Sequence, residues 1–153
     1  MIKIIKDDIL NFDGNIILHQ CNCWTMGSGV AKALYTKYPD IKIQHKYKIE
    51  EFKNHRKDLL GEICVASTNK QYKFVINMFS QYHYGNDGKQ YTNYDAFKKC
   101  LSNVDKLVKK NATIAIPYGI GCVRGGGGWN VIYKIIKDFS KDRIVYLYKL
   151  DRN

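Results

Sequence analysis

The sequence contains little proline and no long apolar run. Its 153 residues include only Pro39 and Pro117, each near the expected end of an element, and no linker rich in Pro or Ser interrupts the chain. No stretch approaches the roughly 20 apolar residues that span a bilayer. The N-terminal MIKIIKDDIL is too short and too charged for a secretory signal. We therefore expect a single domain over residues 1–153, in the cytoplasm and without membrane contact.

Cysteine is present, but its pattern predicts neither a disulfide framework nor a metal site. The cysteines are odd in number and scattered over expected strands and helices, as is typical of reduced thiols; they are Cys21, Cys23, Cys64, Cys100 and Cys122. The motif His19-x-Cys21-x-Cys23 is spaced too tightly along one strand for tetrahedral zinc, and no second pair follows nearby. We expect no bound metal and no cofactor.

Two common phosphate-binding signatures are also missing. No G-x-x-x-x-G-K-[ST] motif occurs, which argues against a P-loop NTPase. The first expected strand lacks the glycine fingerprint of a dinucleotide-binding Rossmann unit, and the acidic pair Asp7-Asp8 follows it instead.

Positive charge is abundant. The chain has 25 Lys and Arg against 14 Asp and Glu, a net charge of +11. Such a balance favours nucleotides, nucleic acids and acidic surfaces as partners. The excess is spread along the whole chain, which agrees better with a doubly anionic small ligand than with nucleic acid, although nucleic acid stays open as a partner.

Strand-like and helix-like segments alternate along the chain. Short apolar runs predict strands, and segments with helical periodicity predict helices: strands at 2–5, 15–21, 62–67, 74–79, 114–117 and 144–150, and helices at 30–37, at 130–139 and from about 92 onward. This order predicts an α/β fold with a mixed, mostly parallel sheet covered by helices on both faces. In such folds, ligands bind beyond the carboxyl ends of the strands.

Two details of this assignment concern capping and exposure. Thr92 and Asp95 have capping-box-like spacing, so the long helix is expected to begin near Thr92. The charged segment 41–57 is helical or irregular, and its histidines, His45 and His55, are expected to face solvent.

Two glycine-rich loops follow strands and precede helices. The first lies within residues 19–31, HQCNCWTMGSGVA, where Asn22 could donate its side-chain amide to a ribose or a water. In the second, six of the ten residues from 119 to 128 are glycine. Glycines let backbone amides approach an anion closely, and the helix dipole adds partial positive charge. Either loop alone also fits a tight connection, but two at one sheet edge predict a diphosphate clamp. Arg124 either adds charge to a phosphate or is solvated.

With these motifs in this order, the chain resembles the macro domain family. The segment Lys6-Asp7-Asp8-Ile9-Leu10 resembles the signature whose Asp receives the adenine amino group. His19-Gln20-Cys21-Asn22 stands where many macro domains carry Asn-Ala-Ala-Asn, and the two glycine loops resemble the diphosphate loops. The resemblance implies a three-layer α/β/α domain that binds ADP-ribose or a derivative as a monomer. It implies these ligand-binding residues: Asp8, Ile9, His19, Gln20, Cys21, Asn22, Met26, Gly27, Ser28, Gly29, Val30, Gln81, Gly119, Ile120, Gly121, Cys122, Val123, Arg124 and Gly125.

Within that family, residues 19–31, 77–85 and 90–94 are most similar to phage and bacterial "Appr-1-p processing" members. Hydrolases of the protein mono-ADP-ribosyl type carry an Asp where this chain has Ala31. Glutamate- and DNA-directed glycosidases use a Lys after the fourth expected strand, and the matching positions here are Ser80, Gln81 and Tyr82. The glutamate-directed enzymes also carry an Asp where this chain has Gly125.

These departures favour a phosphatase acting on ADP-ribose 1''-phosphate, with Asn22 and His83 as the catalytic residues. Trp24 and Tyr82 or Tyr84 are expected to stack on adenine or to cap the distal ribose. The alternatives are a non-catalytic ADP-ribose binder, reader or sponge, and a mono-ADP-ribosyl hydrolase acting on protein or nucleic acid.

Overall fold

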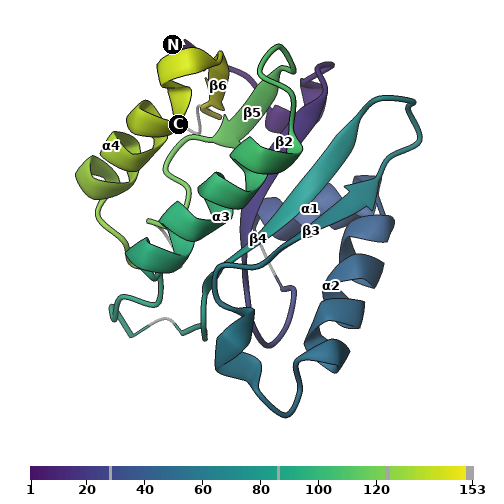
Figure 1. Ribbon diagram of the computed structural model, residues 1–153, viewed down its shortest axis with the longest axis vertical. Helices are drawn as coiled ribbons and strands as arrows, with labels where there is room; N and C mark the ends of the chain where they lie inside the picture. Colours follow the sequence, from purple (N-terminus) through teal and green to yellow (C-terminus); the bar gives the residue numbers. More distant parts are fainter. Residues whose placement is uncertain (28, 86, 123–124, 151–153) are drawn as a thin grey trace.

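The computed structural model describes residues 1–27, 29–85, 87–122 and 125–150. In these residues six strands form one sheet in the order β1-β6-β5-β2-β4-β3 (Figure 1). The strands are β1 (Ile2–Ile5), β2 (Ile16–Asn22), β3 (Ile63–Ser67), β4 (Phe74–Gln81), β5 (Ile114–Pro117) and β6 (Val145–Tyr148). Only the edge strand β3 runs antiparallel to its neighbour, and the other pairs are parallel. The predicted mixed, mostly parallel sheet is therefore confirmed.

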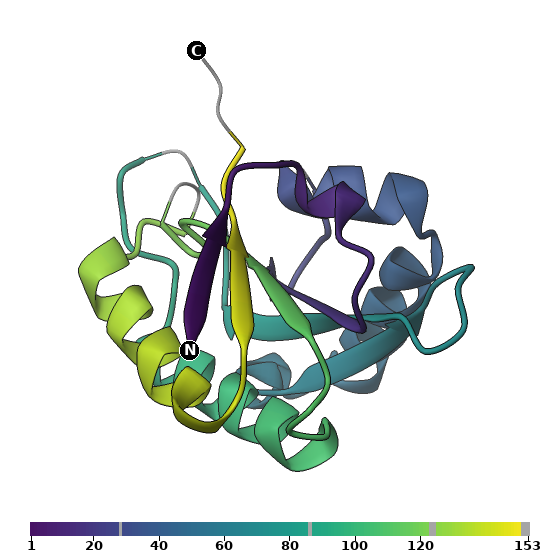
Figure 2. The same cartoon turned by 90° about the horizontal axis from the view of Figure 1, so that it is seen from above.

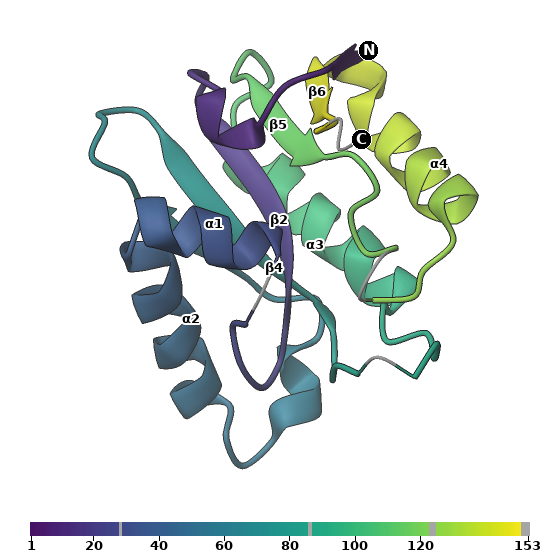
Figure 3. The same cartoon turned by 180° about the vertical axis from the view of Figure 1, so that it is seen from behind.

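Helices cover both faces of this sheet. They are α1 (Val30–Lys37), α2 (Asp40–Glu51), α3 (Tyr94–Leu107) and α4 (Trp129–Phe139), with short 3₁₀ turns η1 (Ile9–Asn11), η2 (Arg56–Leu59) and η3 (Ser140–Asp142). Figure 3 shows α1 and α2 in front of the sheet, whereas α3 and α4 lie in front in the opposite view of Figure 1. Figure 2 shows α1 and α4 on opposite sides of the strands. The predicted three-layer arrangement is confirmed. None of the described helices is long and apolar enough to cross a membrane.

Each helix layer encloses its own hydrophobic core. Successive residues of a strand point to opposite faces, so Ile17 packs under α1 and α2 while its neighbour Leu18 packs under α3 and α4. Phe79 and Leu34 belong to the first core, and Phe97 to the second. The central strands are buried on both faces, which explains why apolar residues follow one another directly at 16–18 in β2 and 114–116 in β5.

The charged segment left unassigned between 41 and 57 contains α2 and η2. Its helix buries Ile41 and His45, and His45 is only 3% exposed, so the expectation that His45 faces solvent was wrong. The polar ring is tolerated inside because its Nε2 donates to a backbone carbonyl, that of Asn22, at 2.9 Å. His55 is exposed, as expected.

The long helix α3 starts at Tyr94 and is capped by Asn93, not by Thr92. The Asn93 side chain accepts a hydrogen bond from the Ala96 amide at 2.9 Å. Thr92 cannot serve as the cap because it pairs with Gln81 in an isolated β-bridge and its hydroxyl donates to the Gly121 carbonyl. The predicted start of this helix near Thr92 was therefore one residue too early for the cap, which is Asn93.

The connections that follow two neighbouring parallel strands, β5 and β2, leave in opposite directions along the sheet. From β2 the chain passes through α1 and α2 to β3 and β4 on one side of the sheet, and from β5 it passes through α4 to β6 on the other. Adjacent parallel strands whose connections leave in opposite directions open a crevice at their carboxyl ends, where ligands bind in such folds. Both glycine-rich loops begin at this point, so their predicted position at one sheet edge is confirmed.

Candidate functional site

The first loop, between β2 and α1, exposes its backbone. A Cβ atom placed on Gly27 or on Gly29 would meet no other atom within 4 Å, so open space adjoins both residues. Gly29 caps α1 with a φ of 66°, which side chains rarely adopt. Met26 is buried in the core beneath α1 and anchors the loop, whereas Val30 is 43% exposed at its end. Ser28 lies outside the described residues.

The second loop follows β5 and has one open glycine. A Cβ on Gly119, whose φ is 79°, would also meet nothing within 4 Å. The next residue, Ile120, is buried in the core under α3 and α4, and the Cys122 amide donates back to the Gly119 carbonyl at 3.0 Å. The loop is therefore a tight turn with its open side at Gly119. Val123 and Arg124 lie outside the described residues.

A network of side-chain hydrogen bonds supports the second loop from below. Thr92 Oγ1 donates to the Gly121 carbonyl at 2.7 Å, and Gln20 Nε2 donates to Thr92 Oγ1 at 2.9 Å. Ser80 Oγ in turn donates to Gln20 Oε1 at 2.7 Å. Gly125 is buried against this network, and its carbonyl accepts from the Thr92 amide at 2.8 Å. Gln20 and Gly125, both predicted ligand contacts, are therefore engaged with the protein itself.

Asn22 ends β2 with its side chain in a defined orientation. Its Oδ1 accepts hydrogen bonds from the amides of Trp24 and Thr25, both at 2.8 Å. Because only the oxygen of the amide group can accept these bonds, the NH₂ group is turned away from the turn. Asn22 therefore lies at the start of the first glycine loop with its oxygen engaged in the turn, and its role as a donor to a ligand stays a prediction.

The loop after β4 places His83 beside Trp24. The two ring centroids are 5.3 Å apart, and the Tyr84 amide donates to His83 Nδ1 at 2.8 Å. This contact assigns the ring proton to Nε2; the Tyr84 carbonyl, at a longer 3.1 Å from Nδ1, would need the other tautomer. Gln81 Nε2 holds the His83 carbonyl at 2.8 Å. The exposed imidazole therefore carries an N–H at the carboxyl edge of the sheet.

His19 and Cys21, two other predicted contacts, lie inside the layer under α1 and α2. His19 Nε2 is 2.5 Å from Asn77 Oδ1, and Asn77 Nδ2 donates to the Ile41 carbonyl, so the His19 proton is on Nε2. Burial lowers the pKa of His19 to about 4 and raises the pKa of the Cys21 thiol well above its usual value. Among the described residues no partner meets His19 Nδ1. The structure does not bring these two side chains to the open face of the loops.

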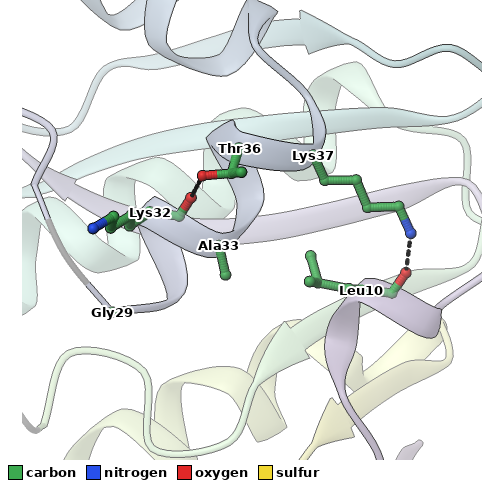
Figure 4. Close-up of a pocket in the computed structure, with 6 residues that line it drawn as sticks. All are labelled: Leu10, Gly29, Lys32, Ala33, Thr36 and Lys37. Carbon is green, nitrogen blue, oxygen red and sulfur yellow. Dashed lines mark hydrogen bonds between the residues drawn. The ribbon is translucent and has the colours of Figure 1, made fainter.

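The segment after β1 lies beside the first loop. Asp8 Oδ1 caps η1 by accepting from the Leu10 amide at 2.9 Å, and Ile9 is buried next to it. Lys37 Nζ donates to the Leu10 carbonyl at 2.8 Å and ties η1 to α1 (Figure 4). Between η1 and α1 is a cavity of about 470 Å³, lined by Leu10, Gly29, Lys32, Ala33, Thr36 and Lys37. This cavity connects the Asp8 segment with the glycine loop.

Among the described residues, no group of three or more His, Cys, Asp or Glu side chains could hold a metal ion. Sequence patterns suggested Thr92 only as a helix cap and Ser80 only as a position without the glycosidase Lys, and they did not point to Arg56, which donates to the Cys23 carbonyl. The contacts of all three join residues far apart in the chain. The pattern of donors and glycines at this edge fits an extended anionic ligand.

Comparison with known proteins gives one family. A family model described as "Macro domain" matches residues 19–136. A comparison with curated proteins gives no match. A solved structure of a protein of unknown function from Bacteroides thetaiotaomicron is similar with a TM-score of 0.83 and 27% identity, over 98% of each chain.

Two more distant structures share the fold. The macrodomain of Mycobacterium tuberculosis DarG has a TM-score of 0.80 at 18% identity, over 99% of each chain. Thermosipho africanus DarTG in complex with ADP-ribose has a TM-score of 0.78 at 14% identity, over 99% of this chain and 43% of that chain.

Proposed function

The chain belongs to the macro domain family, and from this premise we propose that it binds ADP-ribose, as one domain, with the diphosphate between its two glycine loops. The observation that carries the proposal is the open space at Gly27, Gly29 and Gly119. These residues sit at the carboxyl ends of the adjacent strands β2 and β5, where the topology opens a crevice. Backbone amides near glycine and the N-terminus of α1 favour an anion at this point.

The adenosine end is assigned to the cavity between η1 and α1. Leu10 and Ala33 offer apolar surface to a purine, and Gly29 at the cavity wall belongs to the first loop. One oxygen of Asp8 caps η1, and its carboxylate can also accept from the adenine amino group. Ile9 follows directly and provides the backbone beside the base.

The distal ribose is assigned to the opposite end of the crevice. Asn22 presents its NH₂ group there, and Trp24 is 40% exposed beside it. His83 packs against the same indole ring. The group attached to the distal ribose would therefore meet Asn22, Trp24 and His83 first.

We further propose that the reaction is hydrolysis of ADP-ribose 1''-phosphate to ADP-ribose and phosphate. A water oxygen attacks phosphorus, the bond from phosphorus to O1'' breaks, and a proton reaches the leaving oxygen while the water loses one. In its imidazolium form His83 can donate Nδ1–H to the Tyr84 carbonyl, 3.1 Å away, and pass its Nε2 proton to the leaving oxygen, while the attacking water releases its own proton to solvent. Asn22 can hold a phosphate oxygen. The family includes hydrolases, which supports a hydrolytic reaction for this chain.

The test is release of free phosphate from ADP-ribose 1''-phosphate, compared with boiled protein. We expect turnover, and we expect His83→Ala to reduce it by on the order of a hundredfold, as is typical when a general acid is removed. His55→Ala, at another exposed histidine, is the matched control and should leave turnover unchanged. ADP-ribose binding in calorimetry without any phosphate release would reject the phosphatase and leave a non-catalytic binder.

A second candidate function is favoured by the surface around Trp24. The exposed rings of Trp24 and Tyr84 lie with Tyr82 beside Arg56 and Lys57, whose cations approach the Trp24 and Tyr82 rings to 3.7 and 5.7 Å. Exposed aromatic rings among cations are typical of surfaces that stack single-stranded nucleic acid.

This surface supports removal of ADP-ribose from a modified nucleic acid as the alternative reaction. The measurement is loss of label from ADP-ribosylated DNA, RNA and protein in parallel. Release from nucleic acid alone would favour this candidate over the phosphatase, and retention on all three substrates after prolonged incubation would reject it.

A further inference from the structure

Two side chains from the α2–η2 segment hold the end of β2. His45 Nε2 donates to the Asn22 carbonyl at 2.9 Å, and Arg56 Nη1 donates to the Cys23 carbonyl at 2.8 Å. These carbonyls belong to successive residues, just where the register of β2 against β4 shifts between Cys21 and Asn22. A register shift disrupts the regular ladder of backbone hydrogen bonds. Side-chain donors from α2 and η2 therefore satisfy the carbonyls at the point where the strand becomes the loop.

The two donors differ in their surroundings, and both are fixed in place. His45 is 3% exposed, and its ring stacks on Phe79 with centroids 5.2 Å apart and planes 21° apart. Burial lowers the pKa of His45, so the neutral ring donates from Nε2. The guanidinium of Arg56 lies 3.7 Å from the centre of the Trp24 ring while it donates to Cys23.

The consequence is a preformed turn at residues 22–25. His45 and Arg56 hold its carbonyls, and its amides at Trp24 and Thr25 donate to Asn22 Oδ1. Every one of these bonds restricts the same turn, so the outward NH₂ group of Asn22 and the plane of Trp24 are fixed without a ligand. Such preorganisation lowers the entropy lost on binding.

We propose that His45 and Arg56 are positioning residues that make the site selective for ligands with a distal ribose. Toward ADP-ribose they act through Asn22 and Trp24, which they hold in place. The inference rests on the proposed binding of ADP-ribose and adds to it a specific consequence. Loss of the His45 or Arg56 side chain weakens binding of ADP-ribose, whereas ADP, which lacks the distal ribose, binds as before.

The test compares the affinities of ADP-ribose and ADP by calorimetry in four variants. His45→Phe keeps a ring against Phe79 but removes the donor, and His45→Gln restores a donor near the position of Nε2. Arg56→Gln removes the cation over Trp24, and Arg56→Lys keeps charge without the planar fork. We expect His45→Phe and Arg56→Gln to weaken ADP-ribose binding about tenfold, the scale of one lost hydrogen bond, and ADP binding less than twofold. His45→Gln should recover most of the ADP-ribose affinity.

The controls separate this inference from the proposed function. His55→Phe makes the same substitution on an exposed histidine of the same segment and should change neither affinity. If the unaltered protein binds no ADP-ribose, the proposed function fails. If it binds ADP-ribose and both variants lose ADP and ADP-ribose affinity equally, or lose neither, the positioning role is overturned. If thermal melting shows that His45→Phe is unfolded, the comparison of ADP-ribose and ADP affinities in Arg56→Gln tests the positioning role instead, because Arg56 is partly exposed.

Discussion

The two glycine loops look alike in sequence but use their glycines differently. In the first loop, the missing Cβ atoms of Gly27 and Gly29 border open space. In the second loop, a Cβ atom added at Gly125 would press on Thr92, one at Gly126 on Lys89, and one at Gly127 on the Gly121 carbonyl. At the start of this loop Gly119 borders open space, whereas Gly121 does not. The glycines of the first loop thus leave its backbone open to the surroundings, whereas those of the second let the loop pack against its own protein.

The two loops also differ in the side chains that hold them in place. The first loop is held at its start by donors from α2 and η2, which lie outside the loop and leave its glycines free. The second loop rests on the network of Gln20, Ser80 and Thr92. A dense run of glycine is therefore not in itself a measure of how much backbone a ligand can reach.

Among variants that distinguish the two loops, Gly27→Glu is expected to have the largest effect, a loss of ADP-ribose affinity. Its side chain enters open space, so the fold is retained, but a carboxylate at the diphosphate site should weaken ADP-ribose binding by at least about a hundredfold. Calorimetry and thermal melting measure the two properties. Gly121→Glu is the contrasting variant, because its φ of 77° and the approach of Gln20 and Thr92 within 3.1 Å add strain, and it should lose stability as well. Normal ADP-ribose binding by Gly27→Glu would show that the site is wrongly assigned.

The next effect is on stability, in Gly125→Ala. The added Cβ would overlap Thr92 Oγ1 and approach the Gly121 carbonyl to 2.6 Å, so the second loop must shift. We expect a loss of about 2–4 kcal/mol in the free energy of unfolding, measured by urea denaturation. Gly27→Ala is the matched control in the first loop and should change stability by less than about 0.5 kcal/mol. Equal effects of the two alanines would remove the distinction between the loops.

Acid should lower the free energy of unfolding by on the order of 3 kcal/mol, because His19 is buried beneath the first loop. Burial lowers the pKa of His19 from 6.5 to about 4 in the folded state, so between these values the unfolded chain binds more protons. The stability that this buried neutral ring contributes is complete above about pH 6.5 and is lost as the pH falls toward 4. His45, whose pKa is also lowered by burial, shifts stability in the same direction.

The measurement is the free energy of unfolding at several pH values between 7 and 4. His19→Gln keeps a donor for Asn77 and should flatten the profile. A native protein whose stability is constant over this range, or rises as the pH falls, would contradict the assignment of His19 as a buried neutral base.

The smallest effect is expected at the adenosine end, for Asp8→Ala. Loss of a hydrogen bond from the adenine amino group to a carboxylate should weaken ADP-ribose binding by on the order of 1–3 kcal/mol. Inosine diphosphate ribose, which lacks that amino group, is the control ligand, and its affinity should change less. Asp8→Asn keeps the oxygen that caps η1 and separates the loss of the cap from the loss of charge. An equal loss for both ligands would place adenine elsewhere.

Much of the architecture follows from local patterns. The apolar runs of β2 and β4 and the periodic stripe of α3 result from burial, which acts on each segment separately. The strand–loop–helix order then placed both glycine loops at one edge, because parallel strands end on the same side. The position of Asn22 before the first loop was predictable because it stands at the end of a buried strand.

Other features depended on which distant segments meet in the folded chain. His45 and Arg56 sit in a charged segment whose sequence predicts a solvated surface, and only packing against β4 and the end of β2 makes them partners of Asn22 and Cys23. The same holds for Thr92, whose hydroxyl was available to cap a helix but binds the Gly121 carbonyl, 29 residues away. Composition and periodicity describe what a segment buries, whereas hydrogen bonds between distant residues arise from the three-dimensional arrangement of the layers. For that reason the family and the glycine loops could be read from the residues, while the way each loop is held could not.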